Sequence, residues 1–270
     1  MGRPLRVIQN IYPYHLICRT NNRSFRFNQR QVIRIIFKAL KETIEKYDLL
    51  VHHIVLMSNH YHIIATATEE NLHRAMQYFN SRVAVRYNKH VGCSGHLWGD
   101  RYGSCIIDTD KHYLACVRYI YQNPKRAGIV EDLEEFSESS FQFYAFGRKI
   151  DVVLVDDHLV LRLNGNKRKI GEYFRVLVLD EGMNISDEQV KKGLRRMFFG
   201  SADFMQQMYD TYCCPTMNCF FCGIGFQGTG PSINPLKGNF IPPFHPYLRL
   251  SSDVLIGKTG RKQKYVRSAP

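Results

Sequence analysis

Apolar residues recur along the first half of the chain at two spacings, which predict alternating strands and helices. Residues 29–47 carry apolar side chains at three- and four-residue intervals with charged side chains between them, as in an amphipathic helix. Residues 12–20 before it are β-prone. The turn-like stretch between the two ends in Asn28, which we expect to cap the helix while Gln31 reaches back.

The next elements follow the same logic. Residues 49–57 and 60–66 read as two strands joined by the turn-forming pair Ser58-Asn59, so they predict a hairpin. A second helix begins after Thr68, and residues 101–107 read as a further strand. Thr109 or Asp110 then caps a third helix, which we expect to stop at Asn123 because proline disfavours helical geometry in the residue before it.

This order of elements, β, α, β, β, α, β, α, predicts the α+β class: a ferredoxin-like antiparallel sheet with helices on one face. We assign it to residues 1–147. Residues 156–163, 167–179 and 186–199 each read as helical, with Ser186 and Gln189 as a capping box, so residues 148–212 form a helical extension. Residues 213–270 are an irregular segment rich in Cys, Gly and Pro that ends in a basic tail.

The second arm of the predicted hairpin opens with two histidines, in the stretch SNHYHIIA. Side chains two apart on a strand share a face, so His60 and His62 project together and Tyr61 points the other way. Imidazole is the commonest neutral metal ligand in proteins, and this geometry would allow both histidines to bind one metal ion. The ordinary alternative is a polar patch between neighbouring strands.

The third predicted helix adds two further candidates, Tyr119 and Asn123. Four residues apart on a helix, they are separated by about 40° and share a face, whereas Tyr121 points away from Asn123. If that face lies over the start of the His60 strand, two imidazoles, an amide and a phenol meet. That set suits metal-assisted attack of a tyrosine on a phosphate ester. The alternative is a tyrosine of the core or its rim, since the chain has 16 of them.

The charge balance favours a polyanionic partner. Lysine and arginine number 37 against 24 aspartate and glutamate, a formal net charge of +13, and nucleic acid is the first candidate. Four basic residues lie in or beside the motifs and are candidates for phosphate contacts: Arg101, Arg118, Lys125 and Arg126. No stretch approaches the roughly 20 apolar residues of a membrane span, and the N-terminus lacks a signal-peptide pattern. We therefore expect a cytoplasmic protein.

The eight cysteines do not form a disulfide framework. Four are scattered, and Cys213, Cys214, Cys219 and Cys222 form a cluster dense enough for zinc. No second CxxC follows, and adjacent cysteines rarely both bind one ion well. We favour free thiols in a reducing cytosol over a zinc site here.

Three segments in order resemble one family, the single-tyrosine HUH transposases of small insertion sequences, and in particular the bacterial REP-associated tyrosine transposases. They are MSNHYHIIA, GHLWGDRYGS and RYIYQNPKRAGIV, within residues 12–145. The resemblance implies a ferredoxin-like fold and Mg²⁺ or Mn²⁺ held by His60, His62 and Asn123. It further implies Tyr119 as nucleophile, and a 5′-phosphotyrosyl intermediate on single-stranded DNA beside a hairpin. It also places the protein in the bacterial cytoplasm at the nucleoid.

Our leading hypothesis is therefore a metal-dependent transposase or nickase, an HUH endonuclease that cleaves and rejoins single-stranded DNA. The alternative from another class is a non-catalytic DNA-binding protein that kept the fold and the charge. A replication initiator or relaxase is a second enzymatic alternative, but it would usually bring helicase or long partner domains. The sequence leaves open the recognised DNA, and whether the chain acts as a monomer or a homodimer.

Overall fold

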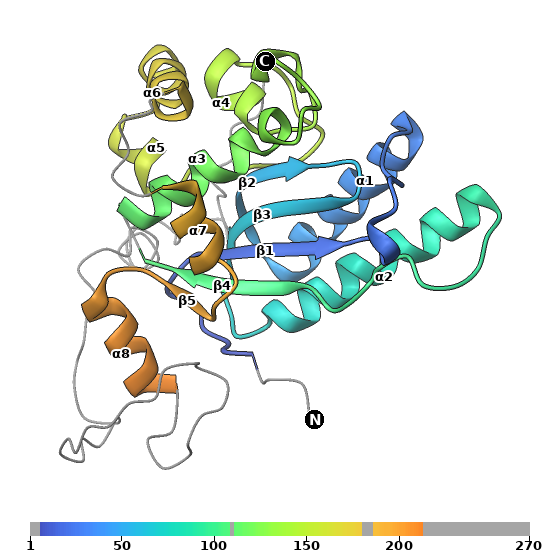
Figure 1. The fold of residues 1–270 in the computed structure, drawn as a ribbon, viewed down its shortest axis with the longest axis horizontal. Helices are drawn as coiled ribbons and strands as arrows, with labels where there is room; N and C mark the ends of the chain where they lie inside the picture. Colours follow the sequence, from blue (N-terminus) through green and yellow to red (C-terminus); the bar gives the residue numbers. More distant parts are fainter. Residues whose placement is uncertain (1–5, 109–110, 180–185, 213–270) are drawn as a thin grey trace, which may run out of the picture. The chain divides into compact units, whose positions relative to one another are not determined.

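The computed structural model describes residues 6–108, 111–179 and 186–212 (Figure 1). The strands are β1 (Tyr14–Arg19), β2 (Leu50–Leu56), β3 (His60–Thr66), β4 (Gly103–Ile107) and β5 (Phe198–Phe199). The helices are α1 (Arg30–Tyr47), α2 (Leu72–Val91), α3 (Lys111–Arg126), α4 (Phe141–Phe146), α5 (His158–Arg162), α6 (Lys167–Leu179), α7 (Asp187–Gly193) and α8 (Ala202–Tyr212). Two 3-10 turns are η1 (Asn21–Arg23) and η2 (Leu133–Glu135). Residues 8–200 belong to one unit, and α8 belongs to another.

The strands form one sheet in the order β2-β3-β1-β4-β5. The first four are antiparallel to their neighbours, and β5 runs parallel to β4. The chain order β1-α1-β2-β3-α2-β4 with this spatial order is the ferredoxin-like arrangement, so the predicted fold class is confirmed. The hairpin predicted at Ser58-Asn59 is also present, because the Met57 N–H donates to the His60 carbonyl at 2.8 Å.

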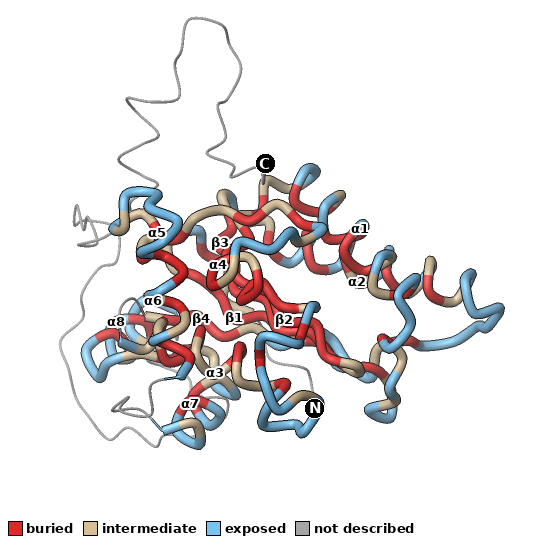
Figure 2. The backbone as a smooth tube through the Cα atoms, turned by 90° about the horizontal axis from the view of Figure 1, so that it is seen from above, coloured by how far each residue is buried: buried red, intermediate tan, exposed pale blue. Residues whose placement is uncertain are grey.

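Helices α1 and α2 pack on each other and lie on the same side of the sheet (Figure 2). Tyr61 of β3 points to that face, where its hydroxyl donates to Asn80 of α2 at 3.0 Å. His62, one residue on, faces α3 on the other side. The expectation of helices on one face therefore holds for α1 and α2, while α3 covers the opposite face. Figure 2 shows the buried residues concentrated along the strands between these layers.

The predicted N-terminal cap of α1 is wrong. Helix α1 is preceded by Gln29 and has no side-chain cap, so the box of Asn28 and Gln31 does not form. The segment that leads into α1 is held instead by the hairpin turn, because the N–H groups of Arg26 and Phe27 both donate to the Ser58 carbonyl at 2.9 Å. The proposed cap at residues 109–110 lies outside the described residues.

Helix α3 does not stop at Asn123 but runs through Pro124 to Arg126. Proline removes one N–H and crowds the preceding turn, yet near the end of a helix that loss is small. The turn closes beyond it, since the N–H groups of Ala127 and Ile129 donate to the carbonyls of Asn123 and Pro124 at 2.9 and 3.0 Å.

The extension is only partly helical as predicted. Helices α5 and α6 lie within the predicted segments, and the capping box of Ser186 and Gln189 is present. Helix α4, which was not predicted, lies just before the extension. The helix predicted over residues 186–199 is wrong beyond Gly193, because Phe198 and Phe199 form β5 beside β4. Both rings are buried, so pairing with β4 overrides the local helical pattern.

Two further expectations can be placed against the described residues. No helix among them is long and apolar enough to cross a membrane. The domain boundary at residue 147 stays a prediction, and the cluster at Cys213, Cys214, Cys219 and Cys222 lies outside the described residues.

Candidate active site

The sheet face beneath α3 carries the histidine pair. His60 and His62 are 8% and 2% exposed, and their ring centroids lie 4.9 Å apart. Directly opposite residues of antiparallel strands share a face, so the pairing of Arg19 with His60 and of His15 with Ile64 brings two β1 side chains to the same surface. The strand alternation expected from the sequence therefore produces a wider polar patch than the pair alone.

Each histidine of the pair is oriented through its Nδ1 atom. Nδ1 of His60 lies 2.6 Å from the amide oxygen of Asn59, and Nδ1 of His62 lies 2.7 Å from Nε2 of His15. The Asn123 amide nitrogen lies 3.4 Å from Nε2 of His62, and an N–H directed there requires the imidazole proton to sit on Nδ1. Both rings are thus held with Nε2 as the atom that can accept a ligand.

Burial keeps these imidazoles neutral. It lowers the pKa of His15 and of His60 to about 3, with the Arg19 charge adding to the effect at His60. The pKa of His62 is also lowered well below its ordinary value, first by burial and then by its histidine and arginine neighbours. Neutral imidazole is the ligand form, so no proton has to leave before a cation binds at neutral pH.

Helix α3 brings Tyr119 and Asn123 to this patch. The Tyr119 ring lies edge-on to His62 with centroids 6.2 Å apart, and the Asn123 amide donates to the Tyr119 carbonyl at 3.2 Å. The structure therefore brings together all four residues singled out from the sequence, within one chain. Their roles in catalysis and metal binding stay predictions. Within the described ranges, no three His, Cys, Asp or Glu side chains are grouped for a metal ion.

Basic side chains surround the tyrosine. The Arg126 guanidinium lies 4.4 Å from the centre of the Tyr119 ring and also bonds to its carbonyl. Burial raises the pKa of Tyr119, while the charges of Arg126 and Arg19 act against that shift. Asp187 of α7 pairs with Arg126 at 2.8 Å and with Arg118 at 3.6 Å.

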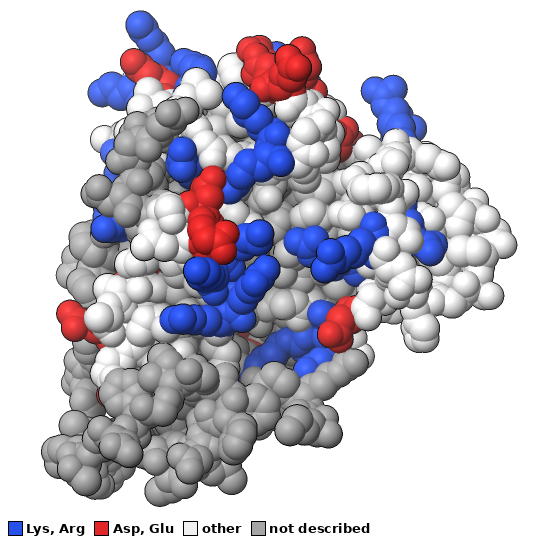
Figure 3. All heavy atoms as spheres, in the orientation of Figure 1, with Lys and Arg blue, Asp and Glu red and all other residues white. Residues whose placement is uncertain are grey.

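The four predicted DNA contacts fall into two places. Arg118, Lys125 and Arg126 belong to the tyrosine helix, and Lys125 is exposed. Arg101 is exposed in the segment before β4 and lines a separate hollow with Arg19 and Arg23. On the face shown in Figure 3, basic side chains gather over α7 and beside the end of β1.

Sequence reasoning missed three side chains of the site: His15, Arg19 and Asn59. The signal for the first two is the same alternation that found the pair, since His15 and Arg19 fall on one face of the strand YHLICR. What that alternation does not give is the pairing of β1 with β3, which alone places His15 beside His62.

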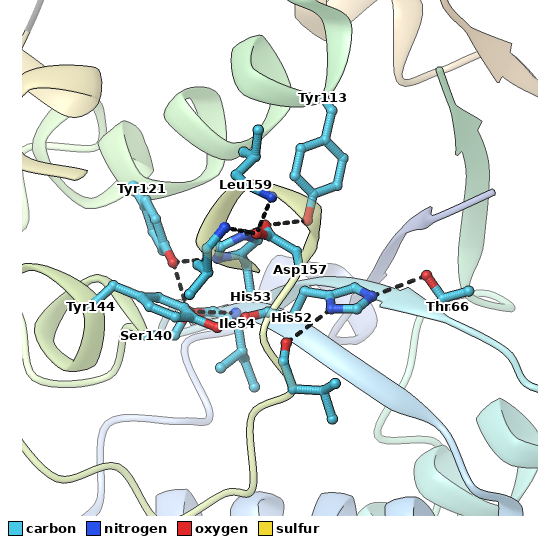
Figure 4. A network of polar contacts seen from close by, with 12 residues as sticks. His52, His53, Ile54, Thr66, Tyr113, Tyr121, Ser140, Tyr144, Asp157 and Leu159 are labelled. Carbon is cyan, nitrogen blue, oxygen red and sulfur yellow. Dashed lines mark hydrogen bonds and ion pairs between the residues drawn. The ribbon is translucent and has the colours of Figure 1, made fainter. Parts of the chain in front are cut away.

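A buried polar network fixes the back of α3 (Figure 4). His53 of β2 contacts the Tyr121 hydroxyl through Nδ1 at 2.6 Å and Asp157 through Nε2 at 2.8 Å. Tyr113 donates to the same carboxylate at 2.8 Å, and Tyr121 contacts Ser140 at 2.9 Å. Because Tyr121 faces away from Tyr119, the network anchors one side of the helix while the other side faces the histidine pair.

Asp157 completes this network from the extension. Its second carboxylate oxygen accepts from the N–H groups of Leu159 and Val160, which caps α5. Burial by itself would raise the pKa of Asp157, but its hydrogen bond and charge interaction with His53 hold the pKa below the ordinary range. The extension therefore contributes one ionised, fully paired group to the position of α3.

Residues 9–123 match the family model described as "Transposase IS200 like". A solved structure described as a REP-associated tyrosine transposase bound to a REP hairpin is 20% identical over 56% of this chain and 90% of its own, with a TM-score of 0.47. A second, described as a candidate transposase from Deinococcus radiodurans R1, is 19% identical over 46% and 95%, with a TM-score of 0.32.

No curated protein matches the chain. Both TM-scores lie below 0.5, so the assignment depends on the family match and on the site within it. The matched segment begins at Gln9, before β1, and ends at Asn123. It therefore contains His60, His62 and Tyr119. Residues 9–123 of this chain are therefore similar in sequence to the IS200-like transposases.

Proposed function

We propose that this protein is a metal-dependent tyrosine transposase that cleaves and rejoins single-stranded DNA through a 5′-phosphotyrosyl intermediate. One observation carries the proposal: Tyr119 and Asn123 of α3 lie beside His62, whose ring is 4.9 Å from that of His60 in the same buried, neutral pair. A nucleophile beside imidazole nitrogens that can accept a ligand is the arrangement that such chemistry needs.

The residues present fit a divalent cation. His60 and His62 each have Nδ1 engaged by a neighbour, which orients Nε2 as a ligand and is the usual outer-shell arrangement at metal sites. Turning the Asn123 amide over would present its oxygen, the atom that Mg²⁺ and Mn²⁺ prefer. A cation held there would polarise a phosphate oxygen of the DNA.

The remaining chemistry belongs to the chain itself. The Tyr119 oxygen attacks phosphorus, the bond from phosphorus to the 3′ oxygen breaks, and the 3′ oxygen gains a proton as the phenol loses one. Arg126 and Arg19 supply positive charge near the phenol, which favours its ionised form. Rejoining is the reverse attack by a 3′-hydroxyl on the phosphotyrosine.

We propose single-stranded DNA beside a hairpin as the substrate. Support comes from the net charge of +13 and from basic residues on and beside α3. Arg118 and Arg126 are held by Asp187 in this structure, so a phosphate contact would compete with that carboxylate.

The test is a cleavage assay on labelled hairpin DNA with single-stranded flanks, in Mg²⁺ or Mn²⁺. Wild type should give a protein-DNA band that survives denaturation and needs the metal, and Tyr119→Phe should give none. Tyr121→Phe is a matched control, because this tyrosine faces the opposite side of the same helix. Binding without a covalent band across varied flanks would favour a non-catalytic DNA-binding protein.

A further inference from the structure

A hollow of about 430 Å³ lies at the end of β1, beside the histidine pair but separate from it. It is lined by residues 17–23 and by the segment from Gly99 to Gly103. Three arginines line it, Arg19, Arg23 and Arg101, against the single carboxylate Asp100. Its volume is within the range that holds a small organic ligand, and its charge favours an anionic one.

The wall of this hollow is held in an unfavourable backbone conformation. Asn22 and Arg23 have φ values of 54° and 53°, in the left-handed region that side chains other than glycine rarely adopt. Such strain persists only where the surroundings impose it, and it is common at ligand sites. Here the Arg23 carbonyl accepts from the Asn59 amide at 2.9 Å, which holds the strained turn in place.

Asn59 connects this wall to the candidate active site. Its carbonyl accepts from the Thr20 N–H at 2.9 Å, while its side-chain oxygen lies 2.6 Å from Nδ1 of His60. On the other side of the hollow, the Gly99 N–H donates to the Arg19 carbonyl at 3.0 Å. The wall of the hollow is therefore held in a fixed position relative to His60.

The same loop exposes an aromatic ring. Phe25, two residues after Arg23, is 71% exposed, the highest exposure among the large hydrophobic residues of the described chain. Arg23 and Arg26 flank it in sequence. An exposed ring between cations is the combination that binds unpaired nucleotides, because bases stack on the ring and phosphates meet the charges.

Arg19 contributes both to the hollow and to the candidate active site. It lines the hollow, and it stands opposite His60 in the β1-β3 pairing. A DNA strand whose phosphate lies at His60 would therefore meet Arg19 next, and then the hollow.

We propose that this hollow binds the nucleotide that flanks the cleaved phosphate in single-stranded DNA. Arg19, Arg23 and Arg101, which line the hollow, contact its phosphates. Phe25, two residues beyond the lining, stacks on its base where the base extends out of the hollow. This inference depends on the proposed function, since it takes the phosphate at His60 as the reference point. It assigns recognition of the flanking strand to the loop between β1 and α1.

The test uses the full chain and hairpin DNA whose single-stranded flank carries the fluorescent base 2-aminopurine, moved one position at a time. The Tyr119→Phe background prevents cleavage during the measurement. We expect quenching at one flanking position, loss of that quenching in Phe25→Ala, and about tenfold weaker binding of the flanked hairpin. Val85→Ala, at a 61% exposed position on α2, is the matched control and should change neither quantity.

The arginines are tested by the salt dependence of binding. Arg23→Ala and Arg101→Ala should each lower the slope of log affinity against log salt by about 0.7, the value for one phosphate contact on a single strand. Arg30→Ala, an exposed position at the start of α1, should leave the slope unchanged. Neither arginine variant should weaken binding of a blunt hairpin that lacks the flank.

The outcomes separate the two proposals. If wild type forms the covalent band but Phe25→Ala and the arginine variants bind the flanked hairpin as wild type does, the hollow is not the flank site and the tyrosine mechanism stands. If the flank variants lose affinity and quenching while wild type forms no covalent band, the hollow binds DNA and the proposed catalysis is wrong. Equal losses on blunt and flanked hairpins would also overturn the assignment of the hollow.

Discussion

Two pairs of histidines lie on neighbouring strands, and their surroundings differ in one decisive way. His52 and His53 of β2 have both ring nitrogens engaged, with Thr66 and Val155 at the first and with Tyr121 and Asp157 at the second. His60 and His62 of β3 have Nδ1 engaged by an amide or an imidazole. Nε2 of His62 lies 3.4 Å from the Asn123 amide nitrogen, at the edge of the hydrogen-bond range.

Burial of a histidine pair can therefore have two different roles, one structural and one in ligand binding. At β2 a carboxylate, two hydroxyls and a backbone carbonyl engage all four ring nitrogens, so the pair connects the sheet to α3 and to the extension. At β3 the imidazoles are desolvated and oriented but keep a nitrogen for another ligand. A histidine with both nitrogens satisfied has nothing left to offer a substrate or a cation.

The largest effect that we expect is a loss of activity when the β3 pair is mutated. His60→Ala should lower the rate of covalent adduct formation by at least about 10³-fold, because it removes one predicted ligand. Its free energy of unfolding should fall by only about 1 kcal/mol, since a single hydrogen bond to Asn59 is lost. Single-turnover cleavage and urea denaturation measure the two. A stability loss as large as the activity loss would contradict the assignment of the β3 pair.

The opposite pattern is expected at β2. Asp157→Ala should lower the free energy of unfolding by about 3–5 kcal/mol, because it leaves His53 and the Tyr113 hydroxyl buried without their partner. Denaturant titration of the full chain measures this effect. Asp203→Ala, an exposed acidic position in α8, is the control and should change stability by less than about 0.5 kcal/mol. A loss equal to that of the control would remove the structural role of the network.

A smaller effect is expected behind the β3 pair. His15→Ala removes the atom that accepts from Nδ1 of His62, so Mn²⁺ affinity should fall by about 10- to 100-fold. Calorimetric titration with Mn²⁺ measures it, and His52→Gln on β2 should bind the ion as wild type does. Unchanged affinity in His15→Ala would mean that His62 needs no such support.

The smallest effect concerns pH. Burial lowers the pKa of His52 from its ordinary value of 6.5 to about 4, so the folded state keeps it neutral where the unfolded chain takes up a proton. Its contribution is therefore constant above pH 6.5 and is lost as pH falls toward 4, at no more than about 1.4 kcal/mol per pH unit. Denaturation at pH 7.5, 6 and 5 should give a flatter profile for His52→Gln than for wild type. Parallel profiles would refute this.

Local periodicity was enough for the parts of the site that lie within one element. Alternation on β3 put His60 and His62 on one face, and the helical repeat put Tyr119 and Asn123 together. It was not enough where contacts join distant segments. The hydrogen bond between His53 and Asp157 links residues 104 positions apart, and the approach of His15 to His62 depends on strand register.

The same limit explains the errors in the fold. Phe198 and Phe199 lie within a helical pattern, but burial against β4 makes them a strand. The N-terminus of α1 is set by contacts to the Ser58 carbonyl, which local capping rules do not include. In each case a tertiary contact outweighs a local preference of a few tenths to about 1 kcal/mol.

The most direct test of the central claim is to map the covalent adduct. Wild-type protein is reacted with flanked hairpin DNA and Mn²⁺, digested with protease and nuclease, and its peptides are analysed by mass spectrometry. We expect a nucleotide phosphate on the peptide that contains Tyr119 and on no other peptide, and its loss in His60→Ala. An adduct on a different residue, or one that forms equally well without the β3 histidines, would contradict it.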